Sequence, residues 1–214
     1  RDLRMSRGLG DVYKRQEMIM PGRFVPPLEN IGYVVDLDFY IYEQLLRAMK
    51  RWKKAGKELF TISTNFSRRN FESGGKNFAG RLKRMADHYG IDPKYIEVEV
   101  TESVVVENVD ELKRVLSELE KFGFRIAIDD FGTGYSSLGV LLEIPADVVK
   151  IDKSFTDRIN LKEQRNFVSQ MGNFIHSAKE EVIFEGIETE EQLQFLRGCG
   201  FLYGQGYLFD RPIP

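Results

Sequence analysis

Polar and ionisable side chains lie near the ends of several hydrophobic segments in this 214-residue chain. They are Asn65, Glu99, Asp129, Asp130, Lys150, Asp152, Glu185, Glu188 and Gln205. Crowded carboxylates repel one another unless a positive group lies among them, and the candidates are a divalent cation and Lys150. The ligand set is rich in oxygen and the chain has only two histidines, His88 and His176, so Mg²⁺ or Mn²⁺ fits better than zinc.

Strand-like and helical patterns alternate along the chain from residue 30 onward. Six segments have the composition of strands, and they span residues 59–66, 95–101, 125–131, 147–153, 181–187 and 201–208. Helical periodicity lies between them, for example over residues 38–54, with Ile41 on the expected core face, and around residues 155–178. Thr189 and Gln192 form a capping-box pattern at the start of a further helix. Repeated strand and helix units imply a parallel sheet.

Such a sheet either lies open as a doubly wound structure or closes into a (β/α)₈ barrel. The sequence contains no Gly-x-Gly-x-x-Gly fingerprint for dinucleotides, and a TIM-barrel-like fold that lacks its first two strands fits the pattern better. In a parallel barrel the carboxyl ends of all strands meet at one face, where barrel enzymes build their active sites. A salt bridge or a carboxylate that faces water would explain polar residues at the end of any one strand. It explains poorly why all six predicted strands end in this way.

Several functional classes fit the composition badly. The net charge of −2 does not predict binding to polymeric nucleic acid. The single cysteine, Cys199, and the lack of a signal-like segment favour a reducing, cytoplasmic compartment. No apolar run approaches the roughly 18 residues of a membrane span, so any membrane anchor would have to lie upstream. A pair of hard cations beside a lysine instead matches metal-assisted attack of water on a phosphodiester.

The segment 129–138, Asp-Asp-Phe-Gly-Thr-Gly-Tyr-Ser-Ser-Leu, resembles a signature of EAL-domain cyclic-diguanylate phosphodiesterases. Five further blocks resemble motifs of the family and follow in the same order, at residues 64–67, 99–102, 150–155, 185–189 and 205–209. The resemblance runs from about Pro21 to Pro212.

The resemblance implies a two-metal site. Asn65, Glu99 and Asp129 would hold one ion, and Asp129 would bridge to a second ion that Asp130 also binds. Mg²⁺ or Mn²⁺ would be the cofactor.

The resemblance also implies roles around that site. Lys150 would orient the attacking water, Glu185 would be the general base or a metal-side partner, and Gln205 would contact the nucleotide. Glu102 would brace the loop 130–137, and Asp152 and Glu188 are further supporting residues.

The chain departs from the family at its beginning, because no Glu-Ala-Leu tripeptide occurs in it. In the family this tripeptide precedes a Pro-Gly-x-Phe block, here residues 21–24, at a distance that would place it near Ser6. Residues 1–16 have no helical or strand periodicity, and their end resembles a translated adapter sequence. We therefore expect residues 1–16 to be an anomalous tail and residues 17–214 to be a partial EAL domain.

The intact parent is expected to hydrolyse cyclic di-GMP to the linear dinucleotide in a bacterial signalling pathway, whereas this chain alone is expected to be inactive. The alternative is a non-catalytic module that binds cyclic di-GMP or another protein. Degenerate members of the family usually lose several catalytic residues by substitution, and the motifs after the gap are intact here, which favours the enzyme. The family commonly joins this domain to a sensor or a GGDEF domain, and the sequence leaves dimerisation open.

Overall fold

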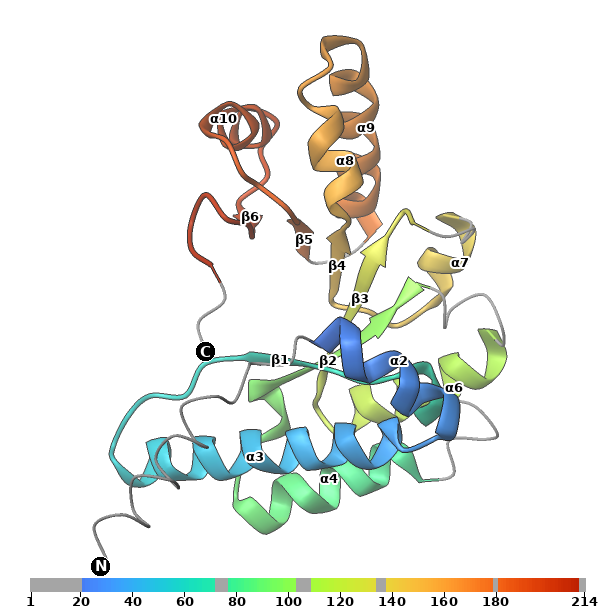
Figure 1. Ribbon diagram of the computed structural model, residues 1–214, viewed down its shortest axis with the longest axis vertical. Helices are drawn as coiled ribbons and strands as arrows, with labels where there is room; N and C mark the ends of the chain where they lie inside the picture. The colour runs from blue at the N-terminus through green and yellow to red at the C-terminus, as the bar shows by residue number, and fades with distance from the viewer. Residues whose placement is uncertain (1–20, 72–76, 103–108, 134–137, 179–180, 212–214) are drawn as a thin grey trace, which may run out of the picture. The chain divides into compact units, whose positions relative to one another are not determined.

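A computed structural model describes residues 21–71, 77–102, 109–133, 138–178 and 181–211 (Figure 1). The chain divides into two units, Arg1–Val34 and Val35–Pro214. The described part of the first unit contains the helix α2 (Pro21–Ile31), which the sequence patterns do not predict. Pro26 and Pro27 lie inside this helix, and each removes a backbone donor, which is why its sequence reads as a loop.

The second unit is built on a parallel sheet of six strands, as predicted. The strands are β1 (Ile62–Asn65), β2 (Ile96–Thr101), β3 (Arg125–Phe131), β4 (Val148–Ile151), β5 (Glu181–Phe184) and β6 (Tyr203–Gly204). Each strand pairs with the next one in the sequence, so the spatial order is β1-β2-β3-β4-β5-β6. The sheet curls into part of a barrel (Figure 1), which confirms the predicted TIM-barrel-like α/β class.

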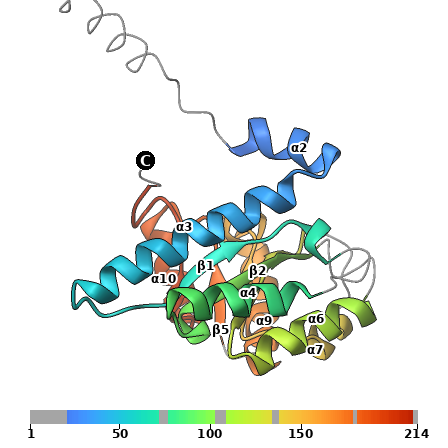
Figure 2. The ribbon, with the colours of Figure 1, turned by 90° about the horizontal axis from the view of Figure 1, so that it is seen from below.

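At least one helix precedes each strand along the chain, and helix side chains share the hydrophobic core with those of the strands. These helices are α3 (Val34–Lys54), α4 (Phe78–Tyr89), α6 (Val109–Lys121), α7 (Leu138–Glu143), α8 (Lys153–Arg158), α9 (Lys162–Ala178) and α10 (Glu190–Gly198). Figure 2 shows α4 and α6 side by side on the outside of the sheet. The predicted capping box of Thr189 and Gln192 begins α10, whereas the segment predicted as one helix around residues 155–178 forms two helices, α8 and α9.

Alternation along the strands separates a hydrophobic face from a polar one. Val98 and Ile126 join the buried core with helix residues such as Leu116, while Glu97 and Glu99 alternate with the valines of β2. The core face of α3 differs from the prediction, because Ile41 is 47% exposed and its neighbour Tyr42 is fully buried instead.

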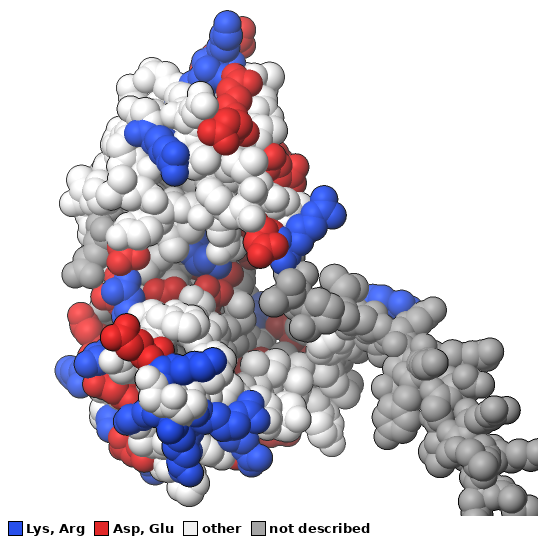
Figure 3. Space-filling model, turned by 90° about the vertical axis from the view of Figure 1, so that its left-hand side faces the viewer, with Lys and Arg blue, Asp and Glu red and all other residues white. Residues whose placement is uncertain are grey.

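Basic side chains gather at the end of α3, whose last turn carries Arg51, Lys53 and Lys54. Positive charge there complements the partial negative charge of the helix C-terminus. Figure 3 shows basic side chains gathered on the lower part of the face that it draws, with acidic and basic side chains interspersed above them. None of the helices in the described part of the chain combines the length and apolar character needed to cross a bilayer.

Gly172 of α9 lies where the helix meets two aromatic rings, and it supplies a test of the packing. A Cβ atom there would lie 2.5 Å from Cζ of Phe201 and 2.9 Å from Cζ of Phe184, and both rings are buried. We expect Gly172→Ala to lower the free energy of unfolding by about 1–3 kcal/mol through overpacking, although alanine is the better helix former. Urea unfolding measures this change.

The matched control is Gly198→Ala at the end of α10, where a Cβ atom would meet nothing within 4 Å. This change should be neutral or stabilising by up to about 1 kcal/mol. Equal destabilisation by both substitutions would contradict the packing argument.

Candidate functional site

One ammonium group joins carboxylates from three segments at the carboxyl end of the sheet. Lys150 Nζ lies 3.2 Å from Oε1 of Glu99, 2.9 Å from Oδ1 of Asp129 and 2.8 Å from Oε1 of Glu185. Glu99 belongs to β2 and Asp129 to β3, while Glu185 directly follows β5. The Lys150 side chain is only 8% exposed, so water screens these ion pairs weakly.

Parallel register explains why these residues meet. Asn65 is opposite Glu99 in the pairing of β1 with β2, and Lys150 is opposite Ile183 in the pairing of β4 with β5. Because side chains alternate along each strand, Glu99, Asp129 and Lys150 project from the same face of the sheet. The site thus depends on strand pairings far apart in the sequence.

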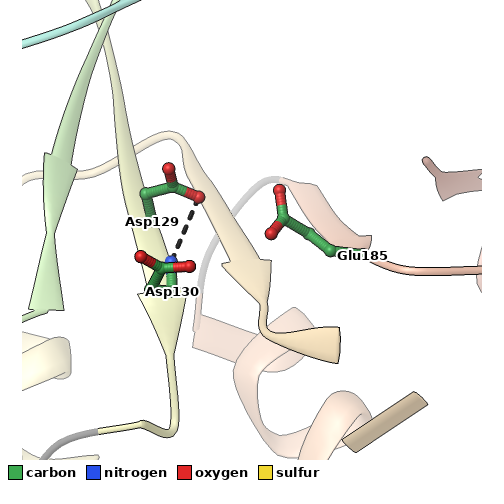
Figure 4. Close-up of side chains that lie close together, drawn as sticks. All are labelled: Asp129, Asp130 and Glu185. Carbon is green, nitrogen blue, oxygen red and sulfur yellow. Dashed lines mark hydrogen bonds between the residues drawn. The ribbon is translucent and has the colours of Figure 1, made fainter. Parts of the chain in front are cut away.

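Asp129 and Asp130 are consecutive, yet both carboxylates reach the same site (Figure 4). Simple alternation would direct them to opposite faces. Two features of β3 remove this conflict: the register with β4 shifts between Ile128 and Phe131, and Asp130 has a left-handed φ of 54°. Bulges commonly redirect side chains beside active sites, and aspartate tolerates the left-handed region better than most residues.

Asp129, Asp130 and Glu185 each offer a carboxylate oxygen, and these three oxygens lie within 4.8 Å of one another. Figure 4 shows Glu185 across from the two aspartates, and the backbone N–H of Asp130 donates to Oδ1 of Asp129 at 3.1 Å. Such a group of hard oxygen donors suits a divalent cation. The two predicted ligands outside this group lie nearby: Lys150 links Glu99 to it, and Asn65 ends β1 beside Glu99.

The electrostatics of the site favour added positive charge. Burial raises the pKa of Glu99 and of Glu185, although Lys150 acts in the opposite direction at both. Burial and the neighbouring charge of Asp129 raise the pKa of Asp130. Burial would lower the pKa of Lys150, but the surrounding carboxylates outweigh it and raise that pKa. Among the described residues, Lys150 pairs with Glu99, Asp129 and Glu185, and no ion pair of Asp130 is seen, so negative charge exceeds positive charge in this cluster.

Two further predicted residues contact this cluster or the loop beside it. Gln205 donates from Nε2 to Oε1 of Glu185 at 2.7 Å. The buried Glu102 accepts a hydrogen bond from the backbone N–H of Gly132 at 2.8 Å, just after β3. Residues 134–137 of the loop that Glu102 was predicted to brace lie outside the described residues.

Asp152 and Glu188 lie at the same end of the sheet but form other contacts. Asp152 caps α8 by accepting a hydrogen bond from Ser154 N at 2.8 Å. Glu188 forms an ion pair with Lys153. His88 and His176 are exposed, on α4 and α9.

A cavity of about 420 Å³ opens beside Glu185 and Gln205, within the size range of small-molecule sites. Its other polar or aromatic lining residues are Lys153, Glu188, Tyr207 and Asp210. The sequence patterns did not single out Lys153 or Tyr207. The signal that could have found them is their place in the blocks 150–155 and 205–209, which resemble motifs of the family.

Comparison with known proteins identifies the family. The sequence profile of the EAL domain matches residues 12–212, and the chain therefore belongs to the EAL domain family. It is 38% identical over 200 residues to "Signaling protein YkoW" of Bacillus subtilis, in an alignment that covers 91% of this chain and 24% of that protein. It is 32% identical over 198 residues to "Bifunctional diguanylate cyclase/cyclic di-GMP phosphodiesterase MucR" of Pseudomonas aeruginosa. That alignment covers 92% of this chain and 29% of MucR.

A solved structure agrees with this assignment. The structure described as "PaMucR Phosphodiesterase, c-di-GMP complex" superposes with a TM-score of 0.81 at 30% identity, over 94% of this chain and 81% of that chain. The present chain spans about a quarter of the length of the curated relatives it matches. The resemblance to the EAL family predicted from the sequence motifs is thus confirmed.

Glu185 should make the stability of the metal-free protein depend on pH. A carboxyl group with a raised pKa binds its proton more tightly in the folded state, so it favours folding below the folded pKa, and this contribution is lost as the pH rises through that value. Glu185→Gln has no such proton. We expect the wild type to gain stability relative to Glu185→Gln as the pH falls from neutral toward 4.5, the ordinary glutamate value.

Urea unfolding of both proteins in EDTA over this range measures the difference. A difference that stays constant, or that moves in favour of the variant on acidification, would contradict the burial argument.

Proposed function

We propose that the intact domain hydrolyses cyclic di-GMP to the linear dinucleotide in a reaction that depends on divalent metal ions. The observation that carries this proposal is the group formed by Asp129, Asp130 and Glu185 beside the buried Lys150. Its place at the carboxyl end of a barrel-like sheet is where barrel enzymes bind substrate. The substrate is taken from relatives that are named as a cyclic di-GMP phosphodiesterase or described as its complex with c-di-GMP.

In this proposal, side-chain oxygens of Asn65, Glu99, Asp129 and Asp130 hold Mg²⁺ or Mn²⁺, with Glu185 at the edge of the set. Hard oxygen donors without histidine or cysteine favour these ions over zinc. When bound, the ions supply positive charge that stabilises the attacking and leaving oxygens of the phosphodiester.

The remaining roles belong to side chains that contact one another. Lys150 donates a hydrogen bond that orients the attacking water, and Glu185 accepts the proton of that water. The raised pKa of Glu185 supports this role, because a carboxylate with a pKa nearer neutrality is a stronger base. Gln205, which bonds Glu185 at the edge of the cavity, contacts the nucleotide.

Three residues act as supports. Glu102 fixes the backbone of Gly132 after the aspartates of β3. Asp152 acts by capping the start of α8, and Glu188 acts through its ion pair with Lys153.

The single cysteine agrees with a cytoplasmic reaction. The name of MucR joins this activity to a diguanylate cyclase, which supports a GGDEF-type neighbour in the parent.

The 214 residues contain no Glu-Ala-Leu tripeptide, so one proposed metal ligand of the family is missing. The comparison protein is a chimera in which the strands of a relative that carry Glu-Ala-Leu are joined ahead of residue 17. We expect the purified chain, with Mg²⁺ or Mn²⁺, to hydrolyse cyclic di-GMP about 10–100-fold more slowly than this chimera, or slower still. Chromatography of the linear product measures both rates. Equal turnover by the two proteins would refute the need for that ligand.

Variants of the chimera separate the proposed roles. Asp129→Asn should lose metal binding and hydrolysis together, because Asp129 is one of the residues that would hold the metal ions. Glu185→Gln should lower the single-turnover rate by about two to four orders of magnitude, with nucleotide binding largely retained, if Glu185 is the base. Glu190→Gln, at the exposed start of α10, is the matched control and should keep the parent rate.

The alternative function has a distinct outcome in the same experiment. If the chimera binds cyclic di-GMP but never cleaves it, or if Glu185→Gln stays within a fewfold of the parent rate, the enzymatic proposal fails. A non-catalytic nucleotide-binding module would then take its place.

A further inference from the structure

Lys150 contacts the same carboxylates that the proposed function assigns to the metal site. Its three partners, Glu99, Asp129 and Glu185, all border or belong to that set. Asp129 and Glu185 also belong to the group whose oxygens lie within 4.8 Å of one another. A cation bound by that group would therefore share two carboxylates with the ammonium group of Lys150.

Two positive charges that share buried carboxylates repel each other. The side chains of Lys150, Glu99, Asp129 and Glu185 are each at most 15% exposed, so solvent offers little screening of this repulsion. Without a metal ion the same arrangement is favourable, because the ammonium holds together carboxylates that would otherwise repel. The lysine thus stabilises the arrangement of ligands and opposes the ion that they would bind.

We propose that Lys150 is the internal counter-ion of the metal-free site: it preassembles the carboxylates, and it competes with the divalent cation for Asp129 and Glu185. This inference rests on the proposed metal site and adds a thermodynamic role to the orienting role of Lys150. A metal ion must displace the ammonium from part of its contacts before it binds. The lysine then remains at the edge of the site with its charge available.

The competition distinguishes Lys150 from a residue that only supports metal binding. Removal of a support would loosen the metal, whereas removal of a competitor tightens it and destabilises the metal-free fold. Lys83 provides the control, because it lies on α4 outside the proposed site and pairs with Asp87, and its side chain is 30% exposed.

The test measures Mn²⁺ binding by calorimetry. It also measures thermal unfolding, with EDTA or with Mn²⁺, for the 214-residue chain and for Lys150→Met, Lys83→Met and Asp129→Asn. We expect Lys150→Met to bind Mn²⁺ at least about tenfold more tightly than the wild type. Its Tm should fall in EDTA, and Mn²⁺ should raise it by more than it raises the wild-type Tm. Lys83→Met should stay within about twofold of the wild-type affinity, because its ion pair with Asp87 is exposed and lies outside the site.

The outcomes separate this inference from the proposed function. If the wild type binds Mn²⁺ in a manner that Asp129→Asn abolishes, but Lys150→Met binds equally or more weakly, the counter-ion role is wrong while the metal site stands. If neither the wild type nor Lys150→Met binds Mn²⁺, the metal site itself fails and the inference with it. If Lys150→Met does not fold in EDTA, Lys150→Gln replaces it, because the glutamine amide can still donate to one carboxylate. The same increase in Mn²⁺ affinity is expected of Lys150→Gln.

Discussion

An ammonium group shared by three carboxylates holds the functional end of this half-barrel together. Glu99, Asp129 and Glu185 come from three separate segments, and they meet at Lys150 only because β2, β3, β4 and β5 pair in parallel and in a particular register. A shift of one residue in any of these pairings would turn a charged side chain away from the site and into the hydrophobic face. Fold and candidate site therefore depend on the same strand pairings.

The opposite ends of the strands show that charge by itself does not define the site. There Arg125 forms ion pairs with Glu97 at 3.3 Å and with Glu181 at 3.0 Å, and the hydroxyl of Ser63 donates to Glu97. This second cluster pairs each carboxylate with a donor. At the carboxyl ends, the Lys150 cluster has Asp130 as an additional carboxylate, whose pKa is raised by partial removal from water and by the charge of Asp129. That excess of negative charge is what makes this end suited to a divalent cation.

Much of this arrangement could be predicted from the sequence, because it follows from local patterns. Strand composition located all six strands, and the polar strand ends indicated one shared site. The resemblance to the family implied that Asp129 and Asp130 share one site, but strand alternation did not, since it places consecutive residues on opposite faces. The irregular pairing of β3 with β4 accompanies the meeting of the two carboxylates. The helix α2 was missed because its prolines are typical of loops, and Ile41 was misplaced because the register of α3 against the core depends on tertiary packing.

The end of the sheet at Asp129, Asp130 and Glu185 is proposed to bind a divalent cation. Anomalous diffraction from crystals grown with Mn²⁺ tests this proposal most directly. We expect a manganese peak among the carboxylate oxygens of these three residues, with Lys150 Nζ moved away from at least one of its present partners. The contradicting result is the absence of a manganese peak at this end of the sheet, with Lys150 still in contact with all three carboxylates, at Mn²⁺ concentrations that saturate an active relative.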